Sequence, residues 1–108
     1  MAKITMDLPG ALSDLPDEER NLLLSRAVRT ATKERIEQLE QELKECEEKI
    51  REFSRKYNMS FDDFERKIEA QEFFGVAYQE DYNDWYFWCE ARQRIEEILR
   101  NLRQSIEP

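Results

Sequence analysis

Apolar residues recur at alternating steps of three and four along the middle of the chain. The positions that follow this spacing are Ile36, Leu39, Leu43, Cys46, Ile50, Phe53 and Tyr57. This is the a and d spacing of helices that pack side by side. Upstream the apolar stripe continues through Leu23, Leu24, Ala27, Val28 and Ala31 with a shifted phase. Pro16 and the acids after it suit a first helical turn, so the pattern predicts one helix over about 16–57.

A second seam with the same spacing lies near the end of the chain. It consists of Trp85, Trp88, Arg92, Ile95, Leu99, Leu102 and Ile106. The seam predicts a helix over about 80–105, in which only Arg92 is not apolar. The burial of Arg92 is either offset by a facing acid, or its guanidinium lies across Trp88 with its stem buried, and the pattern leaves both open. Between the seams, Ser60 can cap the amide of Asp63, which predicts a short helix over about 61–73.

Together these elements predict an all-α fold. Two long helices with matching seams and a short helix between them describe a long antiparallel helical hairpin, coiled-coil-like in its packing. Residues 3–8 alternate polar and apolar side chains before Pro9 and Gly10, which predicts a short N-terminal strand. We therefore expect an N-terminal strand or arm over 1–15 and a helical hairpin domain over 16–108.

Composition narrows the class of protein. The chain has 108 residues, with 2 glycines, 3 prolines and abundant charged residues, as long helices do. No apolar run reaches the length that spans a bilayer, and no signal-peptide pattern opens the sequence. We expect a cytoplasmic protein without membrane contact. Cys46 and Cys89 should lie at comparable levels of the hairpin as free thiols.

The formal net charge of -8 is concentrated beside a dense group of aromatic residues. Residues 61–90 hold nine acids and two bases, a local net of seven negative charges. An acidic surface of this kind attracts basic proteins and repels nucleic acid, so we do not expect the free chain to bind nucleic acid. Aromatic residues supply much of the energy at protein contacts. The residues predicted to bind a partner are Tyr82, Trp85, Tyr86 and Trp88 as anchors, with Asp81 and Asp84 for charge matching.

The sequence argues against catalysis. It has no His, no Gly-rich phosphate loop and no Cys/His metal spacing. Its many acids alternate with bases or lie on a solvated face, whereas a catalytic carboxylate pair needs desolvation to separate the two pKa values. We therefore expect no enzyme activity, no catalytic residues, no metal site and no cofactor.

Two segments resemble antitoxin components of bacterial and archaeal toxin–antitoxin pairs. Residues 56–64, KYNMSFDDF, and residues 80–85, EDYNDW, are similar to motifs of these small helical proteins, which also have an N-terminal strand ending in Leu-Pro and then a long helix. Residues 86–89, YFWC, depart from the Glu and small apolar residues of that pattern, which bears on the choice of toxin. The resemblance implies direct inhibition of a cognate toxin, in many pairs a basic RNA-cleaving enzyme.

Two other classes of protein fit parts of the pattern. The heptad-like seam also suits a self-associating coiled-coil or adaptor protein, and periodicity does not separate an intrachain hairpin from a homodimer. The strand at 3–8 suggests a ribbon-helix-helix DNA-binding repressor. Against that class, the following helix lacks the break that this fold needs, and the overall charge opposes phosphate contacts.

Overall fold

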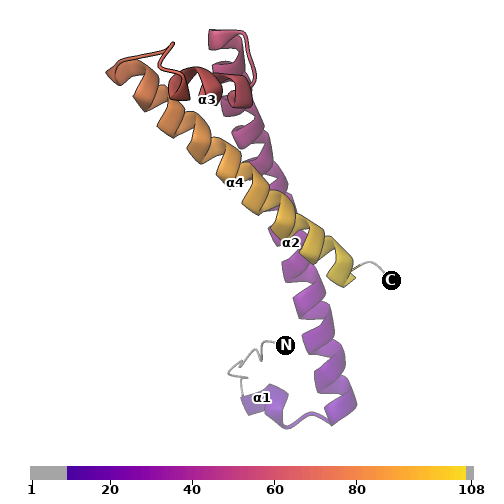
Figure 1. Ribbon diagram of the computed structural model, residues 1–108. Helices are drawn as coiled ribbons and strands as arrows, with labels where there is room; N and C mark the ends of the chain where they lie inside the picture. Colours follow the sequence, from indigo (N-terminus) through magenta and orange to yellow (C-terminus); the bar gives the residue numbers. More distant parts are fainter. Residues whose placement is uncertain (1–9, 107–108) are drawn as a thin grey trace. The chain divides into compact units, whose positions relative to one another are not determined.

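The structure is a computed structural model that describes residues 10–106. Four helices follow one another: α1 (Gly10–Ser13), α2 (Asp17–Tyr57), α3 (Phe61–Glu69) and α4 (Val76–Ile106) (Figure 1). Within this described range every regular element is a helix, so the prediction of an all-α fold is confirmed. The strand predicted at residues 3–8 lies outside the described residues.

The chain divides into two compact units, Met1–Glu34 and Arg35–Pro108. The boundary falls inside α2, whereas the sequence pattern predicts a change of organisation near residue 15. In the described part of the first unit, a main-chain turn links α1 to α2, where the amide of Leu15 donates to the carbonyl of Leu12 (3.3 Å). The Arg20 guanidinium reaches back to the Ser13 carbonyl (3.2 Å) and also pairs with Asp17.

The second unit is the predicted antiparallel hairpin. Lys56 near the end of α2 pairs with Asp81 near the start of α4 (2.6 Å), and Glu40 pairs with Arg103 near the opposite end of α4 (3.9 Å). Between these pairs the predicted seams meet, and α4 crosses α2 (Figure 1). The core cluster is formed by Ile36, Leu39, Cys46, Ala91, Ile95 and Leu99, with Leu43, Trp88, Leu102 and Ile106 packed against it.

The helix α3 lies between the ends of α2 and α4 (Figure 1). Ser60 caps it as predicted, since its hydroxyl accepts a hydrogen bond from the amide of Asp63 (3.2 Å). The helix ends at Glu69, earlier than the predicted residue 73, because Gln71 adopts a left-handed conformation with φ 59°.

The last helix begins at Val76, earlier than the predicted residue 80. Gly75 precedes it with φ 128°, a backbone conformation that side-chain-bearing residues rarely adopt. Gly75 therefore makes the turn that sends α4 back along α2.

The structure settles the environment of Arg92, which the sequence left open. Its guanidinium pairs with Glu96, one turn further along the same helix (3.7 Å). Arg92 is half-buried, and its charge is paired within α4 instead of across the seam.

Candidate protein-interaction site

Aromatic rings from three helices form one packed cluster at the α3 end of the hairpin. Trp85 of α4 lies at its centre, with ring centroids 5.2 Å from Phe64 and 5.4 Å from Phe61 of α3. On the α2 side, Phe53 and Tyr57 stack on Trp85 at 5.7 and 6.2 Å. Trp85 and Phe64 are both 0% exposed. This aromatic cluster joins α3 to both long helices.

The prediction that Trp85 is an anchor for a partner is therefore wrong. Its ring points from α4 into the space between α2 and α3, where intrachain aromatic contacts cover it entirely. Its indole nitrogen Nε1 is buried and has no hydrogen-bond partner among the described residues. The sequence shows that rings surround most of the α4 circumference, but it does not show which of them meets α3.

Asp81 is also hydrogen-bonded within the chain. It accepts hydrogen bonds from Lys56 Nζ (2.6 Å) and from the hydroxyl of Tyr57. Burial alone would raise the pKa of Asp81, but the hydrogen bonds from Lys56 and Tyr57 outweigh it and hold that pKa below its ordinary value. Burial and the Asp81 carboxylate raise the pKa of Tyr57. Asp81 thus ties α2 to α4 instead of presenting a free charge.

Tyr82 and Trp88 are half-buried and contribute to internal packing. The hydroxyl of Tyr82 donates to Glu65 of α3 (2.6 Å), and this hydrogen bond together with burial raises the pKa of Tyr82 to about 12. Trp88 packs against the core cluster of the hairpin seam. Each of these side chains therefore offers a partner only part of its surface.

The remaining predicted residues, Asp84 and Tyr86, are exposed, and they belong to a surface that includes Phe87. Tyr86 is 46% exposed and Phe87 is 57% exposed. Three acids of α4 accompany these rings, and among the described residues none of the three forms an ion pair. We define the acidic aromatic face as Glu80, Asp84, Tyr86, Phe87 and Glu90.

The spacing of this face explains why its members share one side of α4. Asp84 precedes Phe87 by three residues and Glu90 follows it by three, so both acids neighbour the ring along the helix surface. Glu90 likewise follows Tyr86 by four residues. Phe87 is not among the residues predicted from sequence to bind a partner. A helical projection would have identified it, because it places Phe87 away from the apolar seam of α4.

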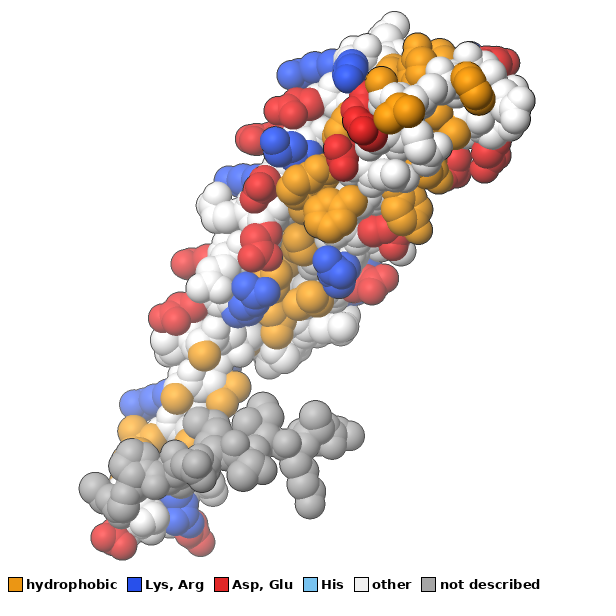
Figure 2. Space-filling view, turned by 90° about the vertical axis from the view of Figure 1, so that its left-hand side faces the viewer, with side chains coloured by type: hydrophobic (Ala, Val, Ile, Leu, Met, Phe, Trp, Pro, Cys, Tyr) orange, Lys and Arg blue, Asp and Glu red, His pale blue; other side chains and the backbone are white. Residues whose placement is uncertain are grey.

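A second exposed apolar group lies at the turn between α3 and α4. Phe74 is 83% exposed and Val76 is 75% exposed. Figure 2 shows hydrophobic side chains gathered at the end of the second unit that holds α3 and the start of α4, and a band of them continues between charged side chains. The sequence signal for Phe74 was its position next to Gly75, which favours a turn over a packed helix.

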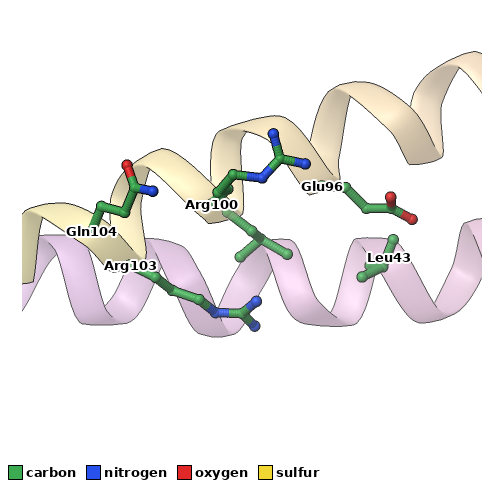
Figure 3. Close-up of a pocket in the computed structure, with 6 residues that line it drawn as sticks. Leu43, Glu96, Arg100, Arg103 and Gln104 are labelled. Atoms are coloured by element: carbon green, nitrogen blue, oxygen red, sulfur yellow. The ribbon is translucent and has the colours of Figure 1, made fainter. Parts of the chain in front are cut away.

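The second unit has several pockets lined by side chains of its helices. One of about 350 Å³ lies between the long helices, lined by Leu43 of α2 and by Glu96, Arg100, Arg103 and Gln104 of α4 (Figure 3). Arg103 of α4 pairs with Glu40 of α2, and Glu96 pairs with Arg92. The charged groups around this pocket are thus largely matched by other side chains of the chain.

The two thiols are poorly suited to nucleophilic chemistry. Both Cys46 and Cys89 are free, and burial raises the pKa of each above its ordinary value. Within residues 10–106, no group of three or more His, Cys, Asp or Glu side chains is placed to hold a metal ion. No helix in that range is long and apolar enough to cross a membrane.

Fold and surface together define a small helical-hairpin protein with an acidic, aromatic face on its last helix. The model of the Uncharacterized protein MJ0235 family matches residues 19–107, so the chain belongs to that family. No curated protein and no solved structure matches the chain.

Proposed function

We propose that this chain is a non-catalytic inhibitor that binds and neutralises a cognate toxin, as the antitoxin components it resembles do. The contact surface is the acidic aromatic face of α4, and the toxin is a basic, RNA-cleaving protein. The observation that carries this proposal is the exposed Phe87 ring, which lies among acids that lack an ion-pair partner in the described chain.

The physical argument combines the two components of this face. Tyr86 and Phe87 offer apolar ring surface, and aromatic side chains set into pockets are frequent energetic centres of interfaces. Asp84 and Glu90 offer charge that would steer a basic partner and match its active-site cations. A surface that imitates RNA in charge would block an RNA-cleaving enzyme at its substrate site. Two free thiols suit the reducing cytoplasm, where we place this activity.

The first experiment is affinity capture of the tagged full-length chain from its native cells, followed by purification of the protein held in near-equimolar amount. The proposal requires this protein to be basic, to cleave RNA and to lose that activity when the chain is added at a 1:1 ratio. A captured protein that cleaves RNA equally well with the chain in excess would contradict the proposal.

Two variants then test the acidic aromatic face. Phe87→Ala should raise the dissociation constant of the complex at least about tenfold, whereas Ile98→Ala, at a less exposed apolar position of α4, should change it less than about threefold. Asp84→Lys should slow association and reduce its dependence on salt. If Phe87→Ala and Ile98→Ala raised the dissociation constant equally, the acidic aromatic face would not be the contact surface.

A self-associating coiled-coil protein is the second candidate function, and one observation favours it. Leu22, Leu23 and Val28 of α2 are each between 43% and 50% exposed. Large apolar side chains exposed so close together on one helix are a common feature of helices that pair with a partner.

A further inference from the structure

One row of side chains runs along the exposed side of α4, from its first residue into the acidic aromatic face. It consists of Val76, Glu80, Asn83 and Phe87, which follow one another at steps of four, three and four residues. These steps keep all four within about 60° around the helix, because each residue turns it by about 100°. All four side chains are exposed. We call this set the Val76–Phe87 row.

The row is apolar at both ends and polar between them. Val76 and Phe87 are both largely exposed, and Phe87 follows Val76 by eleven residues, about 16 Å along the helix axis. A pocket of about 460 Å³ opens at the first end, where its lining includes Phe74, Val76 and Gln79. Phe74 is itself 83% exposed. Large apolar side chains left open at both ends of one helix side are typical of a surface that meets another molecule.

The charges beside the row are all negative. Residues 76–90 hold four acids and no base. Asp81 is paired with a lysine of α2, but Glu80, Asp84 and Glu90 form no ion pair among the described residues. Glu80 belongs to the row, Asp84 lies one turn beyond it, and Glu90 lies one turn beyond the end of the row. A molecule that covers this side of α4 therefore needs an excess of basic groups.

This charge argues against several occupants. A second copy of the chain docked row against row would set the same acids against each other. Nucleic acid and anionic membrane surfaces are negative as well and would be repelled. Residues 1–9 of the chain hold one base and one acid, so they bring no excess of positive charge. A basic partner protein is the occupant that complements the row.

The spacing of the row favours a helix as the partner's contacting element. Side chains on one side of a helix recur at each turn, about every 5.4 Å, which is the repeat of the row itself. Side chains on one face of a strand recur roughly every 6.8 Å and lose register with the row within its length. An extended segment also binds by pairing its main chain with a sheet edge, but every regular element between residues 10 and 106 is a helix.

We infer that the Val76–Phe87 row is the docking surface for a basic amphipathic helix of the partner protein. That helix carries two apolar side chains about eleven residues apart, one for the pocket beside Val76 and one for Phe87. Basic side chains between them face Glu80 and Asp84. The inference rests on the proposed function for the existence of a basic partner. It adds the shape of the partner's contact and extends the contact surface one turn beyond the acidic aromatic face.

The test is photo-crosslinking with the full chain. Benzoylphenylalanine, a photoreactive residue, replaces Val76 in one sample and Phe87 in another, and each purified chain is added to an extract of its native cells. Both samples should crosslink to the same basic protein. Mass spectrometry should place the two crosslinked residues about eleven apart in its sequence, as in a helix that spans 16 Å. Residues about five apart would indicate an extended segment and overturn the inference. Crosslinks to two different proteins, to a second copy of the chain or to no protein would also overturn it.

A variant at the end of the row separates this inference from the proposed function. Val76→Ala should raise the dissociation constant of the crosslinked partner at least about fivefold. Val28→Ala, the matched control at an exposed valine of α2, should change it less than about twofold. Circular dichroism checks that both variants keep the helix content of the parent.

The two proposals fail in different ways. If the chain inhibits an RNA-cleaving partner but Val76→Ala and Val28→Ala have equal effects on binding, the docked helix is overturned and the proposed function stands. If the partner shows the eleven-residue spacing and the loss at Val76 but does not cleave RNA, the proposed function is overturned and the docked helix stands.

Discussion

Trp85 and Phe87 are two residues apart in one helix but differ entirely in their surroundings. Trp85 is enclosed by Phe53 of α2 and by Phe61 and Phe64 of α3, whereas Phe87 contacts the neighbouring Trp88 and is largely exposed. We predict that Trp85→Ala lowers the free energy of unfolding by about 3 to 5 kcal/mol, because it opens a cavity among packed rings. Urea denaturation followed by circular dichroism measures this loss.

The control for this prediction is Phe87→Ala, which should change the free energy of unfolding by no more than about 0.5 kcal/mol. Where the loss at Trp85 exceeds the stability of the chain, Trp85→Phe provides a milder change at the same position. Similar stability for Trp85→Ala and Phe87→Ala would contradict the central position of Trp85 in the aromatic cluster.

Asp81 provides a pH-dependent link between α2 and α4. We predict that Asp81→Asn lowers the free energy of unfolding at pH 7 by about 1 to 2 kcal/mol, because Lys56 and Tyr57 lose a charged acceptor. The folded-state pKa of Asp81 is depressed, so its stabilising effect is complete above the ordinary carboxyl pKa of about 4 and is lost as the pH falls through the lower folded value.

The difference between Asp81→Asn and the parent chain should therefore shrink as the pH falls below about 4, and it should be lost once the pH is below the depressed folded-state pKa of Asp81. Thermal unfolding at a series of pH values tests this expectation. Asp84→Asn, at an exposed position with no ion pair in the described chain, is the control and should show little effect at any pH. A difference at Asp81 that persists unchanged at pH 2 would rule out the charge as its cause.

At the scale of the element, the stability of α3 depends on the residue that caps its N-terminus. Ser60 accepts a hydrogen bond from the amide of Asp63, which is otherwise without a helical acceptor. We predict that Ser60→Ala destabilises the chain by about 1 kcal/mol and that Ser60→Asp retains most of the stability, since Asp also caps helices. Urea denaturation measures both variants. Ser25→Ala, at an exposed position inside α2, is the control and should be neutral or slightly stabilising.

The elements themselves could be predicted from sequence to different degrees. The seams from Ile36 and from Trp85 predicted both long helices and their antiparallel packing, because each seam buries one side of its helix. The direction of the α4 aromatic rings could not be predicted, since it depends on where α3 docks, and this is a tertiary contact between distant residues. For that reason the sequence predicts Trp85 both as a seam residue and as a partner anchor, and only the contacts with α3 decide between the two. The exposure of Phe87 follows instead from its position away from the seam.

The boundaries of α3 and α4 depended on single backbone conformations. Gln71 and Gly75 both have positive φ values, and the turn between them shortens α3 and lengthens α4 relative to the sequence pattern. Glycine signals such a conformation in a sequence, but glutamine does not. The predicted start of α2 needed no such residue, because Pro16 and three acids mark it directly.

At the scale of the whole molecule, the buried core is confined to one of the two units. Every buried hydrophobic residue in the described chain falls between Ile36 and Leu99, inside the unit Arg35–Pro108. The described part of the first unit has exposed apolar side chains on α2 and no fully buried one. The two units should therefore differ strongly in their protection from hydrogen exchange.

We predict that in dilute solution the amides of residues 17–34 exchange at least about a hundredfold faster than those of residues 36–53, although both belong to α2. An isolated helix of this length is marginal in water, whereas residues 36–53 are packed against α4. If the chain self-associates through the exposed apolar side chains of α2, as the second candidate function requires, exchange at 17–34 should slow as concentration rises, while exchange at 36–53 stays constant. Hydrogen exchange with mass spectrometry at two concentrations separates these effects. Uniform protection of α2 in the dilute monomer would show that the first unit is stabilised by contacts within the chain, and its apolar stripe would then need no partner.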